Sequence, residues 1–351
     1  MRKDILKIFQ VAAVFIGTIV GAGLASGKEI TQFFTSFGIY SFLGILLCGL
    51  LYIIMGSIIC KISIMYKLNS YGDLIKTISP NLLGKLTGGI TTIYLISSAS
   101  IILAGSGALI SQCFSVPKIV GTLIMLIFAS IFLLRGTCGL ITVNSFIVPA
   151  LISTITLITI FYFVFARDSV SLATISNYPP QKNGILISTI LYAGYNLLCS
   201  SGVLVPLSTE VKKPRVMLIG ITLGAIGLTL LCIMINLLLA ANQPYIYEYE
   251  IPLLFVANRF GSFIKALLLI IILLEMFSTE VSDIYSISRT LEQTFNIQYK
   301  KGIFIVLAFA LPISQIGFTN LISTLYPIFG FLSLIFIAQC IIFYIRHNIR
   351  D

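Results

Sequence analysis

Midway through the first long apolar run of this sequence stands the stretch GTIVGAGLASG, which covers residues 17–27. Four of its residues are glycine, and each glycine in a helix interior costs about 1 kcal/mol relative to alanine. We therefore expect the polypeptide to leave the helical conformation here. Unwinding at membrane depth exposes backbone N–H and C=O groups, which is tolerated only where these groups line a cavity or hold a ligand. The stretch thus predicts a binding site built largely from backbone.

The chain as a whole has the composition of a membrane protein. Its 351 residues are 58% hydrophobic and only 10% charged, whereas soluble domains carry about 25% charged residues. The apolar runs are about 20 residues long and show no period-two alternation, so they predict helices rather than barrel strands. We expect one all-α transmembrane domain over residues 1–351. Its ten expected spans lie near residues 7–35, 39–65, 84–113, 118–134, 139–166, 184–207, 215–241, 252–288, 301–316 and 319–345.

The distribution of charge predicts an orientation in the membrane. The net charge is +10, which in a soluble protein would suggest a nucleic-acid partner. Here the basic residues lie between apolar runs, so the expected partner is the lipid bilayer and not nucleic acid. Most of the 22 lysine and arginine residues fall on the side of Met1, which predicts a multi-pass protein of the cell membrane with both termini in the cytoplasm. The first apolar run is expected to remain as a span rather than to be cleaved as a signal peptide.

Patterns typical of catalysis or metal binding are scarce. The only histidine, His347, lies in the basic C-terminal tail, and the seven cysteines form no CxxC pair. The sequence also has no HExxH or GxSxG motif. We therefore expect no enzymatic activity and no cofactor beyond a possible coupling Na+ or H+.

The spacing of the spans suggests two repeats, near residues 7–166 and 184–345. Corresponding spans are separated by about half the chain, and five spans per repeat require the second repeat to be inverted in the membrane, as in many secondary transporters. Residues 192–202, at the matching place in the sixth span, again contain Gly, Ser and Asn. We therefore expect a second broken helix there. GxxxG-type packing of small residues is the alternative interpretation of the glycines, and the match between the two spans favours broken helices.

A known architecture shares these features. Two inverted sets of five spans with broken first and sixth helices resemble the amino acid, polyamine and organocation superfamily, whose members share the LeuT-like fold. More narrowly, FIGTIVGAGLASGKEI (residues 15–30) looks like the signature of the YkvI-like membrane proteins, and IPLL (251–254) and LEMFST (274–279) also resemble that branch. The resemblance covers essentially the whole chain. It implies a secondary transporter that works by alternating access.

The resemblance also implies where a solute would bind. The backbone N–H groups of Gly21, Ala22 and Gly23 would meet the carboxylate of an amino-acid-like solute, and the sixth-span break would face its other end. The full set of expected solute-binding residues is Gly21, Ala22, Gly23, Ala25, Ser26, Tyr195, Asn196, Ser200, Ser201 and Gly202. Tyr192 and Tyr195 could gate the site or anchor the helix at the interface. Lys28 and Glu29 could form a vestibule pair or a solvated helix end.

A polar stripe on the eighth span suggests a coupling site. A carboxylate at the centre of a bilayer costs about 2.5–3.5 kcal/mol on insertion scales, so Glu275 is expected to face a wet cavity, a cation or a partner. In LeuT-like sodium-coupled members, carbonyls of the first helix join a small residue and two hydroxyls of the eighth helix. Gly17 and Val20 would supply the carbonyls, and Ser278 and Thr279 match the hydroxyl pair. Because Glu275 replaces the small residue, a proton remains an alternative to sodium. Hydroxyls that bond only to their own helix are the structural alternative.

Two functions follow from these expectations. The first is cation- or proton-coupled symport of an amino acid or similar small organic solute. The alternative is a non-transporting, nutrient-sensing membrane subunit of the germination-receptor type, which would bind a solute without moving it. The sequence leaves protein partners open.

Overall fold

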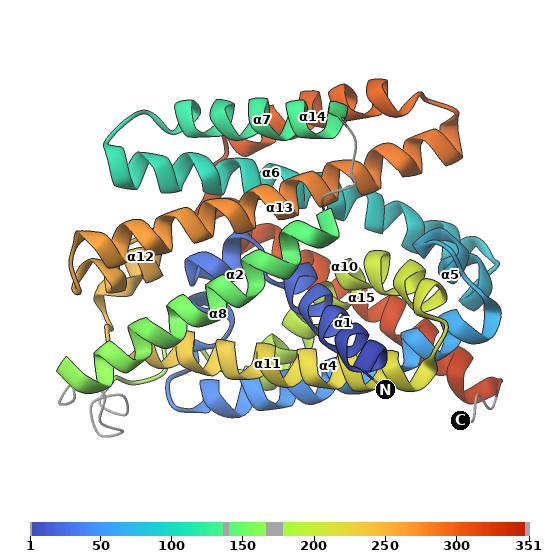
Figure 1. Ribbon diagram of the computed structural model, residues 1–351, viewed down its shortest axis with the longest axis horizontal. Coiled ribbons are helices and arrows are strands. Elements are labelled where there is room, and N and C mark those ends of the chain that lie inside the picture. The colour runs from blue at the N-terminus through green and yellow to red at the C-terminus, as the bar shows by residue number, and fades with distance from the viewer. Residues whose placement is uncertain (1, 136–139, 166–177, 348–351) are drawn as a thin grey trace.

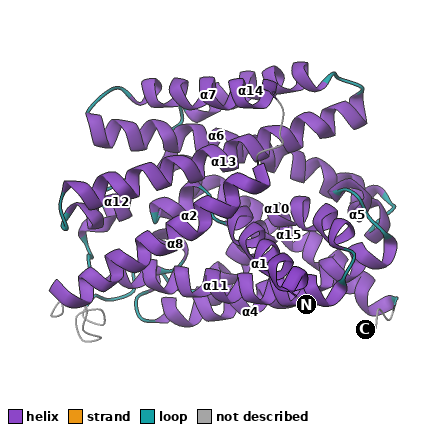
Figure 2. Cartoon of the chain, viewed as in Figure 1, coloured by secondary structure: helices purple, strands orange, loops and turns teal. Residues whose placement is uncertain are grey.

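The structure, a computed structural model, describes residues 2–135, 140–165 and 178–347. Within these ranges the regular secondary structure is helical, and the helices stack in layers (Figures 1 and 2). The helices are α1 (Arg2–Ile19), α2 (Ala22–Ser26), α3 (Lys28–Phe33), α4 (Tyr40–Tyr66), α5 (Tyr71–Ile78), α6 (Leu82–Phe114), α7 (Lys118–Arg135), α8 (Leu140–Phe165), α10 (Ile185–Val211), α11 (Pro214–Ala240), α12 (Pro252–Asn258), α13 (Ser262–Phe295), α14 (Tyr299–Ser314) and α15 (Phe318–Arg346), with 3-10 turns η1 (Thr35–Phe37) and η3 (Tyr245–Tyr247).

The helix lengths identify a multi-pass membrane protein. Among the described residues, 7 helices are long and apolar enough to cross a membrane, and the apolar segment of α7 is shorter. The seven are α4, α6, α10, α11, α13, α15 and the Ile147–Phe165 part of α8. The expected first span corresponds to α1, α2 and α3 in succession, and the expected ninth span corresponds to the 16-residue helix α14. Residues 139 and 166, the expected ends of the fifth span, lie outside the described residues.

The expected eighth span, 252–288, begins too early and is wrong at its N-terminal end. Residues 252–258 form the separate short helix α12, and the long helix α13 starts only at Ser262. Gly261, directly before α13, has φ 95°, a conformation that interrupts a right-handed helix and that glycine adopts at little cost. The apolar run is therefore continuous in sequence but not in structure.

The expected break in the sixth span is also wrong. Helix α10 is continuous from Ile185 to Val211 and contains all of residues 192–202. Asn196, Ser200 and Ser201 each donate a side-chain hydrogen bond to a backbone carbonyl one turn earlier in their own helix. Gly194 instead permits close packing, because a Cβ at this position would overlap the hydroxyl of Ser333 on α15.

The long helices form two packed groups. Helices α6, α7, α13 and α14 pack together at one side of the molecule, whereas α1, α4, α10 and α11 form the second group (Figure 1). Helix α8 packs on α1, α11 and α13, and α15 packs on α10, α4 and α6. Many contacts come in pairs related by exchange of the two halves: α1 packs on α11 and α10 on α4, while α6 packs on α7 and α13 on α14.

Candidate functional site

The candidate site lies where the first membrane segment is interrupted. Helix α1 ends at Ile19, and α2 begins at Ala22, so Val20 and Gly21 stand outside both helices. Gly21 is extended, with φ −120° and ψ −167°. Between these helices the backbone must find other partners, because the first turn of a helix leaves N–H groups without an intrahelical acceptor. The interruption is enclosed by protein, since Val20, Ala22 and Gly23 are all buried.

Gly27 produces a second change of direction six residues after Gly21. It ends α2 and precedes α3 with φ 82° in the left-handed region, where a side chain is costly. A Cβ here would also stand 2.9 Å from Cγ of Leu253 on α12. Glycine is therefore required at this position by both conformation and space.

Glu29 folds back from α3 onto the interruption. Its side chain is only 2% exposed and lies so close to Gly23 that a Cβ there would overlap the carboxyl group. The hydroxyl of Tyr195 donates to Oε2 of Glu29 at 2.9 Å, and the hydroxyl of Tyr192 donates to the same oxygen at 3.2 Å. The interrupted segment, which comprises α1, α2 and α3, is thus joined to α10 through one buried carboxyl group.

Aromatic rings surround this carboxyl group. Tyr195 stacks on Tyr326 of α15 with ring centroids 4.7 Å apart, and Tyr192 meets Tyr195 edge-on at 5.4 Å. Phe33 of α3 contacts both tyrosines of α10, at 5.3 and 5.9 Å. Tyr94 of α6 lies 6.4 Å from Tyr195. The tyrosines of α10 therefore belong to the interior of the site and are not interfacial anchors.

The placement of Glu29 settles a choice that the sequence left open. It does not pair with Lys28, because the ammonium group of Lys28 donates to the backbone carbonyl of Tyr249 at 2.9 Å. It is not part of a solvated helix end either, because it is buried. Sequence reasoning did not include Glu29 among the solute-binding residues. A usable signal existed: an acidic residue six positions after Gly23, together with two tyrosines spaced three apart on the sixth span.

The opposite side of the interruption contacts α13. The hydroxyl of Thr279 lies 3.5 Å from the carbonyl oxygen of Val20 and donates at 3.0 Å to the carbonyl of Glu275 on its own helix. Thr279 also lies beside Gly21, 3.8 Å from the position of a Cβ there. Gly17 stands in the last turn of α1, three residues before Val20. The structure thus brings Val20, Gly21 and Thr279 together.

Acidic side chains on α13 are buried inside the protein. Glu275 is 1% exposed, Glu280 is 0% exposed, and neither carboxyl group has a hydrogen-bond partner. Asp283, 4% exposed, lies against Ser98 of α6. The ion pairs formed among the described residues do not include Glu275, Glu280 or Asp283. Buried charges are costly unless they are paired, so these groups need either a proton or a cation.

The remaining expected site residues are distributed unevenly. Ala22, Ala25 and Ser26 are buried in α2, and the hydroxyl of Ser26 donates to the carbonyl of Gly23 at 2.9 Å. Ser278 is buried on α13. On α10, the side chains of Asn196, Ser200 and Ser201 bond to their own helix, as described above. Gly202 is exposed, and a Cβ there would meet no atom within 4 Å.

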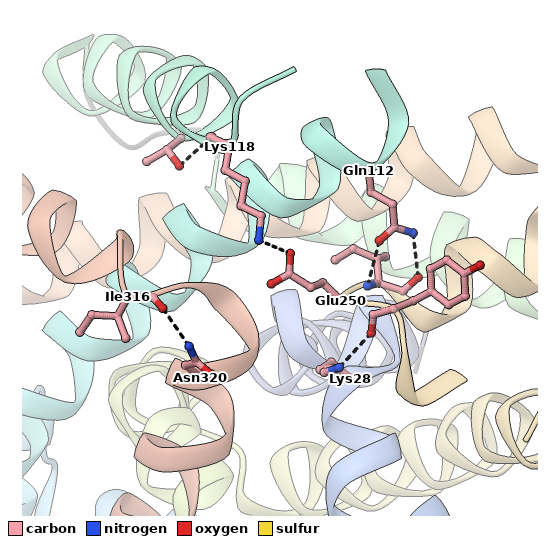
Figure 3. A network of polar contacts seen from close by, with 9 residues as sticks. Lys28, Gln112, Lys118, Glu250, Ile316 and Asn320 are labelled. Carbon is pink, nitrogen blue, oxygen red and sulfur yellow. Dashed lines mark hydrogen bonds and ion pairs between the residues drawn. The ribbon is translucent and has the colours of Figure 1, made fainter. Parts of the chain in front are cut away.

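The segment Tyr249-Glu250-Ile251, which leads into α12, lies over one end of the interrupted segment (Figure 3). Gln112 of α6 bonds to both backbone groups of Ile251, and Lys118 of α7 forms an ion pair with Glu250 at 2.6 Å. Lys28 holds the carbonyl of Tyr249 from α3. Helices α3, α6 and α7, which all lie far from this covering segment in the sequence, therefore hold it in place.

Comparison of sequences identifies relatives over nearly the whole chain. No protein-family model matches this sequence. The chain is 30% identical over 329 residues to the uncharacterized membrane protein YkvI of Bacillus subtilis (strain 168), covering 94% of both chains. It is also 24% identical over 333 residues to the uncharacterized protein YyaD of the same organism, covering 94% of this chain and 95% of YyaD.

Solved structures with the same fold are distant in sequence. A manganese transporter of Eremococcus coleocola superposes with a TM-score of 0.66 at 15% identity, over 93% of this chain and 76% of the transporter. MhsT in complex with L-phenylalanine also has a TM-score of 0.66, at 14% identity, over 90% of this chain and 79% of MhsT. Mhp1, a nucleobase-cation-symport-1 family transporter crystallised with bromovinylhydantoin, has a TM-score of 0.60 at 13% identity, over 91% of this chain and 74% of Mhp1.

These similarities confirm the expected family and the coarse fold. The structural neighbours described as transporters are carriers and not enzymes, in agreement with the absence of catalytic motifs in the sequence. At such low identity the structural matches establish the fold alone, whereas the match to YkvI establishes kinship. The chain belongs to the YkvI family of multi-pass membrane proteins and has the LeuT-like fold of these solved structures.

Proposed function

We propose that this protein is a secondary transporter that moves a small organic solute across the cell membrane by alternating access, with both termini in the cytoplasm. The observation that carries the proposal is the interruption at Val20 and Gly21, which lies between Thr279 of α13 and the Glu29–Tyr195 contact with α10. It stands between the two packed groups of helices. Irregular backbone enclosed at membrane depth is typical of transporter binding sites.

The arrangement of helices supports ten spans in two inverted repeats, 7–166 and 184–345. The packing of α1 on α11 corresponds to that of α10 on α4 when the two halves are exchanged, and α6 on α7 corresponds to α13 on α14. Two halves with the same fold, inverted in the membrane, would produce such paired contacts. In this proposal the α6–α7–α13–α14 group and the α1–α4–α10–α11 group move relative to each other around the interruption.

The coupling ion is proposed to bind between Val20 and Thr279. Their two oxygens are 3.5 Å apart, a separation at which both can ligate one cation at about 2.4 Å, as oxygen ligands hold Ca2+. When the hydroxyl of Thr279 donates to the carbonyl of Glu275, its oxygen lone pairs are available to a cation. Glu275 stands one turn earlier on the same face of α13 and supplies a negative charge or a proton-binding group. Gly17 and Ser278 complete the proposed site.

The solute is proposed to lie along the interrupted segment, against Gly21 to Ser26 on one side and Tyr195 on the other. Because α10 is continuous, the side chains of Tyr195 and Asn196 replace the backbone groups that a broken sixth helix would have offered. Ser200, Ser201 and Gly202 lie farther along α10 and make a smaller contribution in this arrangement.

Uptake into proteoliposomes tests the proposal. The purified protein should accumulate labelled solute from an amino acid and amine library when a Na+ or H+ gradient is imposed, and accumulation should collapse when that gradient is dissipated. Thr279→Ala should reduce uptake at least tenfold under a Na+ gradient. Glu275→Gln should abolish coupling to H+ if the carboxyl group carries the proton.

Thr222→Ala is the matched control, because the hydroxyl of Thr222 bonds to Leu218 within α11, away from the interruption. A solute that binds with no measurable flux under any gradient would contradict transport. That result would favour the alternative of a nutrient-sensing subunit.

A further inference from the structure

We propose that the site at the interruption takes an organic cation, with the ammonium group of the solute against the carboxyl group of Glu29. This inference rests on the proposed transport function and specifies its substrate class. It reverses the polarity expected from the sequence, in which the backbone around Gly21 and Gly23 would meet a solute carboxylate.

The position of the Glu29 carboxyl group carries the first step. It lies directly against Gly23, the place where a solute carboxylate was expected. A second carboxylate at this place would meet a like charge in a site from which water is excluded, where charge repulsion is strong. An ammonium group at the same place would instead form a charge-assisted hydrogen bond.

The second step is that no basic group of the described protein neutralises Glu29. The neighbouring Lys28 is directed to the carbonyl of Tyr249, and the ion pairs given for the described residues do not include Glu29. The groups that face the carboxyl group are the hydroxyls of Tyr192 and Tyr195, with Tyr326 nearby. Buried carboxylates are normally paired. A buried carboxyl group needs either a proton or a counter-charge, and the proposal assigns the counter-charge to the solute.

The third step concerns the aromatic walls. Tyr195 and Tyr326 stack face to face, and Phe33 and Tyr192 stand beside them at an angle. Aromatic rings attract cations through ring faces that no other ring covers, so in this proposal the ammonium group lies against the face of Tyr195 that is turned away from Tyr326. The hydroxyls of Tyr192 and Tyr195 now occupy donor positions on Glu29 that an ammonium group would take, so binding requires at least one of them to turn aside.

A second carboxyl group adds to the negative potential. Asp283 of α13 interacts with Ser98 and lies near Tyr326, and its Oδ2 has no partner. Tyr326 thus interacts with two acidic groups, Glu29 of α3 and Asp283 of α13. A cationic solute would be favoured by both groups, whereas an anionic solute would be opposed by both.

The test compares matched solutes that differ only in charge. Each triple contains an amino acid, the amine that lacks its carboxyl group and the acid that carries hydrogen in place of its amino group, for example phenylalanine, 2-phenylethylamine and 3-phenylpropionate. The full chain is placed in nanodiscs of neutral lipid, so that amines are not attracted to the bilayer, and apparent Kd values are obtained from the shift in unfolding temperature with concentration. We expect at least one amine to bind tenfold or more tightly than its amino acid and its acid.

Glu29→Gln should weaken the binding of that amine at least tenfold, because glutamine keeps an acceptor oxygen for the tyrosines but removes the charge. Glu248→Gln, at an exposed position, makes the same change in net charge and should leave the Kd unchanged. An acid or amino acid that binds as tightly as its amine would overturn the proposal, as would a panel in which no amine binds. If Glu29→Gln does not yield folded protein, the order of Kd values for the three solutes on the unmodified protein still tests the proposal.

Uptake of the same compounds into proteoliposomes separates this inference from the proposed function. Transport of an amino acid without preference for amines would overturn the assignment at Glu29 and leave transport standing. Binding of an amine that depends on Glu29 but is never followed by uptake would support the assignment and contradict transport.

Discussion

Gly23→Ala places a methyl group where the carboxyl group of Glu29 now lies. The carboxyl group must move away, and it then loses the hydrogen bonds from Tyr192 and Tyr195. Overpacking of this kind typically costs about 1–3 kcal/mol, and hydrogen bonds to a charged group contribute about 1.5–3 kcal/mol each. Alanine recovers about 1 kcal/mol through its better helix propensity. These terms sum to about 3–8 kcal/mol, and we expect a net destabilisation at the lower end, about 3 kcal/mol.

Gly202→Ala is the matched control for this substitution. It lies in the interior of α10 and is exposed, with no atom within 4 Å of a new Cβ, so it should stabilise the protein by about 0.5–1 kcal/mol. Reversible unfolding of both variants in the same lipid nanodiscs measures the difference. The reasoning is refuted if Gly23→Ala is as stable as the parent protein, or if Gly202→Ala costs stability.

A double-mutant cycle locates the cause of the effect. In a Glu29→Ala background the space beside Gly23 is open, so the added methyl group should cost little there. The coupling free energy between the two positions should therefore be about 3 kcal/mol. A value near zero would mean that the methyl group acts through the backbone of α2 and not through Glu29.

Two further pairs of substitutions test other parts of the structure. Gly27→Ala should destabilise the protein by more than Gly184→Ala, because both glycines have positive φ but only Gly27 also lacks space for a Cβ; the backbone penalty alone is about 1–2 kcal/mol, and equal unfolding temperatures for the two variants would contradict the steric argument. Gln112→Ala should cost about 1–3 kcal/mol by leaving both backbone groups of Ile251 without their partner, whereas Lys118→Ala removes a partly exposed ion pair worth about 0–1 kcal/mol. Hydrogen exchange at the amide of Ile251 should accelerate in Gln112→Ala but not in Lys118→Ala. Equal exchange rates in the two variants would contradict this ranking.

Much of the architecture was predictable because it depends on local properties of the chain. Length and apolarity of the runs indicated helices that cross a membrane, and the described helices lie close to the expected ranges. The resemblance of residues 15–30 to YkvI-like proteins is confirmed by the 30% identity to YkvI. The split between α12 and α13 was not predicted, because a turn at a single glycine, Gly261, does not interrupt the hydropathy of the run.

The errors in the site arose where one residue type serves two purposes. Glycine and serine in the sixth span suggested unwinding, yet α10 is continuous. Gly194 provides room for Ser333 of α15, and the serines of α10 bond to their own helix. Helix unwinding and close helix packing both use small residues, so the two cannot be distinguished in the sequence. Only the contacts with the neighbouring helix distinguish them.

The sequence alone determined that this is a helical membrane protein with glycines concentrated in its first span, because composition and periodicity act within a few turns of one helix. Only the tertiary structure decided what Glu29 does. Tyr192 and Tyr195, which lie 163 and 166 positions farther along the chain, supply the hydroxyls that hold its carboxyl group. Burial there turns an apparent helix end into a side chain at the centre of the candidate site. Burial and partnership are properties of the packed helices, and no local pattern encodes which of them will meet.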